Sequence, residues 1–136
     1  MFTKSVLFLA LVISSQLSSV NAQDSPFKDQ LPGKWKHEHR QLGVSADTFK
    51  VYKADGTFTA VSKINLIGID TAVAYKGTWA FLKSGSLRLQ VKESSNTLYV
   101  GDDDVFLLKG VKIVEGVMSY EHDGDPNREV QLKDEE

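Results

Sequence analysis

Two histidines one residue apart are the clearest candidates for chemistry in this chain. They are His37 and His39, in the segment KWKHEHRQ at residues 34–41. Imidazoles at this spacing on one face of a strand can hold a metal ion, or they can hydrogen-bond the polar end of a ligand in a pocket. A metal ion needs a third protein ligand, and His122 is the remaining histidine. The choice depends on the direction of each side chain, and so on the elements that carry them.

Established catalytic motifs are absent from the sequence. There is no cysteine to act as a nucleophile, and no G-x-S-x-G, P-loop or G-x-G-x-x-G segment. His37-Glu38 would need a histidine at position 41 to form a zincin motif, and that position is Gln41. No pair of carboxylates on a shared inward face is evident for acid–base work. We therefore expect no enzyme activity and no bound cofactor.

Period-two alternation of apolar and polar residues runs through the chain after residue 30. The segment SLRLQVK at residues 86–92 places three aliphatic residues on one face and polar residues on the other, which is typical of a strand with one buried face. Asp55-Gly56 separates two such segments and predicts a hairpin. Many short strands joined by tight turns favour an all-β fold, a single antiparallel up-and-down barrel of about eight strands.

The alternation also predicts which side chains face the barrel interior. On residues 48–53 we expect Phe49 and Val51 inside, with Lys50 outside, and on the last strand we expect Val130 and Leu132 inside. The remaining expected inner residues are Trp35, Phe58, Ala60, Ile64, Tyr75, Trp79, Phe81, Leu87, Leu89, Val91, Phe106, Leu108, Met118 and Tyr120.

Residues 1–22 are typical of a cleaved export signal. Lys4 precedes the short apolar run VLFLALVI, and a small, polar segment ends at Ala22. The run is too short to span a bilayer as a helix. No cysteine follows it to carry a lipid anchor. We expect one domain, residues 23–136, in the periplasm or outside the cell.

The charge balance argues against a nucleic-acid partner. The chain has a formal net charge of −2 and no basic face. Neither feature favours a particular partner.

A series of short motifs resembles the bacterial lipocalin-like domains of the calycin type. It comprises L-x-G-x-W at residues 31–35, a Phe followed by DGTF at residues 55–58, Y-x-G-T-W at residues 75–79, and then an alternating L-x-L. The resemblance spans roughly residues 31–133. It implies an antiparallel barrel, open at one end and often with an apolar cavity.

In larger lipocalins, an arginine near the last strand packs on the tryptophan of the first strand. Trp35 matches the tryptophan position, and Arg128 is the candidate for the arginine. The resemblance implies that this pair would close one end of the barrel. The alternative is that Arg128 flanks a turn in solvent.

The first strand can be oriented from its own residues. Trp35 points to the core, so His37 and His39 share its face, while the opposite row is entirely charged. Two residues along a strand span roughly 6.6 Å. Both histidines are therefore predicted to point into the barrel.

These expectations favour non-enzymatic binding of a small apolar molecule inside the barrel. The candidate lining residues are His37, His39, Phe58, Tyr75, Trp79 and Tyr120. One alternative is a filled barrel that serves as an interaction or inhibitor module for an envelope or extracellular protein. Another is a metal site formed by His37, His39 and His122, which requires the three imidazoles to converge.

Overall fold

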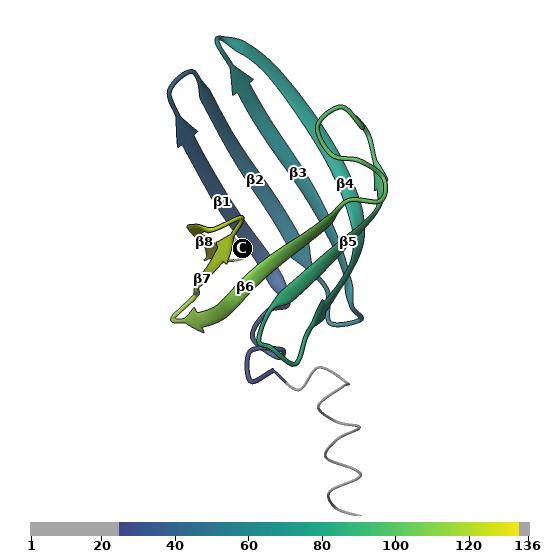
Figure 1. Cartoon of the computed structure of the whole chain (residues 1–136), viewed down its shortest axis with the longest axis vertical. Helices are drawn as coiled ribbons and strands as arrows, with labels where there is room; N and C mark the ends of the chain where they lie inside the picture. The colour runs from purple at the N-terminus through teal and green to yellow at the C-terminus, as the bar shows by residue number, and fades with distance from the viewer. Residues whose placement is uncertain (1–24, 134–136) are drawn as a thin grey trace, which may run out of the picture.

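The structure, a computed structural model, describes residues 25–133, so the predicted export signal lies outside the described residues. The described chain is all-β, and its strands close into one barrel in which each strand is antiparallel to both neighbours (Figure 1). The predicted fold class is therefore confirmed. Within residues 25–133 there is no helix long and apolar enough to cross a membrane. The strands are β1 (Gly33–Gln41), β2 (Val44–Tyr52), β3 (Thr57–Leu66), β4 (Ile69–Phe81), β5 (Leu87–Ser94), β6 (Val105–Val114), β7 (Val117–His122) and β8 (Asp125–Leu132).

The barrel wall is uneven in height. Strands β1 to β4 form a tall, tilted wall, whereas β7 and β8 are short (Figure 1). β1 pairs with β2 along its whole length but with β8 only as far as His37. The side chains near the short strands therefore lie close to an opening of the barrel.

One end of the barrel is filled and closed. Its largest fully buried side chains include Trp35, Tyr52, Phe58 and Phe81, which fill the interior between the strands. Residues 26–30 form consecutive turns beneath this end, and Leu31, fully buried, follows them. The Trp35 indole donates a hydrogen bond of 2.7 Å to the Leu31 carbonyl, which ties the closing segment to β1.

On β2 the structure reverses the predicted faces. Thr48, Lys50 and Tyr52 are buried inside, whereas Phe49 and Val51 are only half-buried. Phe49 lies on the outer face, where the ammonium groups of Lys36 and Lys63 sit 5.6 and 5.5 Å from its ring centre. The prediction of Phe49 and Val51 as inner residues was wrong, because two lysine ammonium groups cover the Phe49 ring outside the barrel.

On β8 the predicted faces are also reversed. Glu129 is fully buried, while Val130 and Leu132 are 43% and 37% exposed. Arg128 is exposed on the outer face, so it does not pack on the buried Trp35, and the alternative of a solvent-exposed arginine holds. The physical reason is that Glu129, and not an apolar residue, takes the inward position opposite β2.

Two irregularities adjust the strands. In β6 the register shifts between Lys109 and Lys112, where Gly110 has a φ of 61°, and the inner residues change from Leu108 to Val111. In β4 the register shifts between Lys76 and Gly77. A Cβ at Gly77 would collide with the Gln90 carbonyl on β5, so glycine allows this close approach.

Candidate ligand-binding cavity

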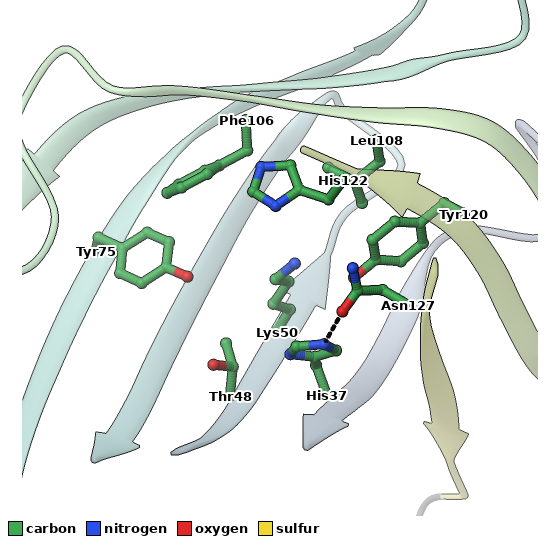
Figure 2. Close-up of a pocket in the computed structure, with 9 residues that line it drawn as sticks. All are labelled: His37, Thr48, Lys50, Tyr75, Phe106, Leu108, Tyr120, His122 and Asn127. Atoms are coloured by element: carbon green, nitrogen blue, oxygen red, sulfur yellow. Dashed lines mark hydrogen bonds between the residues drawn. The ribbon is translucent and has the colours of Figure 1, made fainter. Parts of the chain in front are cut away.

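A cavity of about 140 Å³ lies in the part of the barrel that the core does not fill. Its lining combines aromatic and aliphatic side chains with one ammonium group, two imidazoles and an amide (Figure 2). Buried side chains form the floor, and half-buried side chains from β1, β6, β7 and β8 form the rim. The lining residues are His37, Thr48, Lys50, Tyr75, Phe106, Leu108, Tyr120, His122 and Asn127.

A buried ion pair supports the floor. Lys50 Nζ lies 2.8 Å from Glu129 Oε2, and the Tyr120 hydroxyl donates a 2.6 Å hydrogen bond to the same oxygen. The Lys50 and Glu129 side chains are 10% and 0% exposed. Two donors thus converge on one carboxylate oxygen, as a buried charge requires.

The protonation states of this group follow from its surroundings. Burial by itself would lower the pKa of Lys50, but the Glu129 carboxylate outweighs it and the pKa is raised. Burial raises the pKa of Tyr120 well above its ordinary value, and the Glu129 charge adds to the effect. The pKa of Tyr52 is raised for the same two reasons. At neutral pH the lysine is therefore charged and both phenols are neutral.

Two buried polar atoms near this pair are incompletely satisfied. Within residues 25–133, Glu129 Oε1 and the Tyr52 hydroxyl make no hydrogen bond of good geometry, although the Glu129 carboxylate acts directly on the Tyr52 hydroxyl. An unsatisfied buried polar atom costs about 1–3 kcal/mol. The interior of this barrel therefore departs from a fully satisfied core at the very place where the ion pair lies.

The rim is held by a hydrogen-bonded histidine. Asn127 Nδ2 donates to the Asp125 carbonyl at 3.0 Å, which directs Oδ1 toward β1. His37 Nε2 then donates to Asn127 Oδ1 at 3.0 Å, as Figure 2 shows. In the neutral ring this leaves His37 Nδ1 as an acceptor.

Aromatic rings form the other side of the cavity. The Phe106 ring lies 6.0 Å from the His122 ring and 6.0 Å from the Tyr75 ring, centre to centre. These spacings are usual for tilted and edge-to-face aromatic pairs. The Tyr75 hydroxyl points toward the Lys50 ammonium across the cavity (Figure 2). This side provides apolar contact area for a ligand.

The predicted lining residues separate into two groups. His37, Tyr75 and Tyr120 line the cavity. Phe58 lies in the core against Tyr75, and the Trp79 indole donates to the Lys53 carbonyl at 2.9 Å, so it fastens the β2–β3 turn. The last of the six, His39, lies beyond the cavity, exposed, with its Nε2 3.1 Å from Gln41 Oε1.

The three histidines do not form a metal site in the described part of the chain. No group of three or more histidine, cysteine, aspartate or glutamate side chains there could hold a metal ion. His37 and His122 share the cavity, but His39 does not reach it. The metal alternative therefore lacks its third imidazole.

Sequence reasoning missed the charged floor and part of the rim, namely Thr48, Lys50, Asn127 and the supporting Glu129. Hairpin register could have found Lys50. Lys50 and Ala60 are directly paired across the β2–β3 hairpin, and directly paired residues lie on the same face of a sheet. Because Ala60 was expected inside, its partner had to be inside as well.

The chemistry available in the cavity is hydrogen bonding and charge pairing. Thr48 Oγ1 lies 2.7 Å from Ser62 Oγ, and within residues 25–133 it makes no hydrogen bond to a histidine or a carboxylate. Lys50 remains protonated, so it is a donor and not a nucleophile.

No protein-family model matches this chain, and a comparison with curated proteins finds no matching sequence.

Proposed function

We propose that this protein binds one small organic molecule in the barrel cavity and does not transform it. The observation that carries the proposal is a cavity that joins an aromatic wall to a buried, charged lysine. Small-molecule sites typically combine apolar lining with a few placed polar groups. Membership of the lipocalin-like proteins and export from the cell are parts of the same proposal. They are supported by the closed eight-stranded barrel and by the signal-like residues 1–22.

The size of the cavity limits the ligand. An apolar cavity of roughly 150 Å³ accommodates a molecule the size of benzene. At about 140 Å³, this cavity encloses a compact molecule, and a long acyl chain would have to extend out through its mouth. The expectation of an apolar ligand is thereby narrowed to a compact one with at least one polar group.

The raised pKa values favour binding over catalysis. A catalytic lysine or tyrosine needs a pKa near the working pH. The pKa values of Lys50 and Tyr120 are both raised, away from neutral pH. Both groups therefore keep one protonation state, which suits a fixed recognition site.

Native mass spectrometry of protein purified from its own host tests the proposal. We expect a bound species below about 200 Da, released on denaturation, because a cavity of this size holds few atoms. The control is Leu108→Trp, which fills the cavity from its buried floor and should abolish the bound species. Circular dichroism should show that the variant keeps its β structure. An unliganded mass for the wild type, unchanged by toluene, benzoate or benzamide, would argue against binding.

A second candidate function, protein interaction, is favoured by apolar residues at the tips of two hairpins. Leu42 is fully exposed, and Ile67 and Ile69 are 80% and 69% exposed. The Ile67 amide donates to the Gly43 carbonyl at 2.8 Å, so the tips are joined. Contiguous exposed apolar residues often mark contact sites.

Affinity purification from the source organism separates the two functions. Wild-type protein is compared with a Leu42→Ser and Ile67→Asn double variant, which leaves the cavity unchanged. A partner retained by the wild type and lost by the variant supports the interaction function. Identical recovery from both proteins counts against it.

A further inference from the structure

We infer that the ligand of this cavity is a compact organic acid whose carboxylate is held by the Lys50 ammonium group. This inference rests on the proposed binding function and names its ligand class. It starts from the charge of the lining. One ammonium group lines the cavity, and none of the nine lining residues is an aspartate or glutamate.

The partner of Lys50 lies behind it. Glu129 is fully buried and is not part of the lining. The ion pair therefore presents its positive end to the cavity and its negative end to the protein interior. A ligand meets the ammonium first, so an anionic group is favoured there and a cation is repelled.

Lys50 has hydrogen-bonding capacity left for a ligand. An ammonium group carries three N–H donors. Within the described residues, Glu129 Oε2 is the one acceptor that Lys50 Nζ contacts. The remaining donors match the two oxygens of a carboxylate, and hydrogen bonds between charged partners are about twice as strong as neutral ones.

A second donor faces the same position. The Tyr75 hydroxyl makes no hydrogen bond within residues 25–133, and it points toward Lys50 in Figure 2. The Tyr120 hydroxyl, in contrast, already donates to Glu129. A carboxylate between Lys50 and Tyr75 would therefore satisfy donors from β2 and β4, the two strands that flank β3.

The apolar wall specifies the rest of the molecule. Tyr75, Phe106 and Leu108 present rings and a branched aliphatic group beside the polar floor. A flat ring or a branched aliphatic group of benzene size fits this volume. Benzoate is a suitable probe, benzamide is its neutral isostere, and toluene lacks the polar group.

Ligand titrations followed by NMR test the inference with these three probes. For the purified wild-type protein we expect benzoate to bind about tenfold more tightly than benzamide, a difference typical of one charged hydrogen bond. In the Lys50→Met and Glu129→Gln double variant, the ratio of the affinities for benzoate and benzamide should fall to about one, while toluene binding remains. The matched control is Lys63→Met, which removes the same charge from the outer face and should keep the preference.

The outcomes distinguish the inference from the proposed function. Equal affinities for benzoate and benzamide, or a preference that survives in the double variant, overturn the carboxylate assignment and leave small-molecule binding intact. Failure of all three probes to bind overturns both.

A measurement on the wild type covers the case in which the double variant does not fold. At saturation, the ¹⁵N signal of the Lys50 ammonium group should shift clearly more with benzoate than with benzamide. An unchanged signal with benzoate overturns the inference.

Discussion

Lys50 on β2 and Glu129 on β8 form a buried ion pair across the interior, although β1 lies between their strands. Their side-chain atoms approach to 2.8 Å, and the residues are 79 positions apart in the chain. A buried pair of this kind contributes little net stability, because removing both charges from water offsets their attraction. Removing one partner is different, since it leaves a single charge buried.

The first prediction concerns this asymmetry. Lys50→Met should lower the free energy of unfolding by about 3–5 kcal/mol, because Glu129 loses its counter-charge. The Lys50→Met and Glu129→Gln double variant should lie within about 1 kcal/mol of the wild type, since no charge remains buried. Urea unfolding at pH 7 measures both. A double variant as unstable as the single one would show that the pair itself stabilises the barrel.

The sequence predicted the faces of β1 and β5 because polar and apolar residues there separate cleanly. Trp35 points inward beside an outer row that is charged throughout, and Leu87, Leu89 and Val91 are fully buried as expected. The number of strands and the closed barrel followed from the same alternation and from the turn residues. These features depend on local signals, which a single sequence contains.

The faces of β2 and β8 were mispredicted because each charged residue was judged alone. Lys50 and Glu129 can be buried only as a pair, and no local pattern reveals a partner 79 residues away. Register was the missing information. Met118, expected inside, is directly paired with Glu129 across the two-residue turn between β7 and β8. The charged floor of the cavity follows from this pair and could not be predicted without it.

The second prediction tests whether the segment before β1 closes the barrel. Leu31→Ala should lower the free energy of unfolding by about 2–5 kcal/mol, because a fully buried leucine is truncated. Leu42→Ala is the matched control and should change it by less than about 0.5 kcal/mol, because Leu42 is fully exposed. Thermal and urea unfolding measure both variants. Similar losses in the two variants would contradict the closing role of Leu31.

The third prediction concerns the bulge between β4 and β5. Gly77→Ala should lower the free energy of unfolding by about 1–3 kcal/mol or more, because its Cβ would collide with the Gln90 backbone. Gly101→Ala should lower the free energy of unfolding clearly less, since its Cβ would meet only the Asp104 side chain, 3.0 Å away. Denaturant unfolding compares the two. If both cost the same, the close approach of β4 and β5 at Gly77 would not be required.

The fourth prediction concerns the Asp55 carboxylate at the β2–β3 turn. The Thr57 hydroxyl donates to it at 2.6 Å and the Thr57 amide at 3.0 Å, and these bonds lower the pKa of Asp55. A lowered folded-state pKa means that the carboxylate stabilises the fold above its unfolded pKa, and that this contribution is lost as pH falls through the folded pKa. Thr57→Val should raise the pKa toward its ordinary value. An NMR titration of the carboxyl carbon measures it, and an unchanged pKa would exclude the hydroxyl as the main cause.

Ile67 occupies an unfavourable backbone conformation at the tip of the β3–β4 hairpin. Its φ is 50° and that of Gly68 is 82°, which corresponds to a type I′ turn. A β-branched residue is a true outlier in this region, and Ile67 is also 80% exposed. The side chain therefore adds backbone strain without burying apolar surface within the barrel.

The fifth prediction follows from this strain. Ile67→Asn creates the Asn-Gly pair that a type I′ turn prefers, and it should raise the free energy of unfolding by about 0.5–1 kcal/mol. The matched control is Ile69→Asn, at an exposed position outside the turn, which should not stabilise the barrel. Urea unfolding measures both variants. Stabilisation by Ile67→Asn together with loss of a captured partner would mean that Ile67 serves interaction at a cost to the fold, whereas a destabilised variant would show that the isoleucine contributes to the barrel itself.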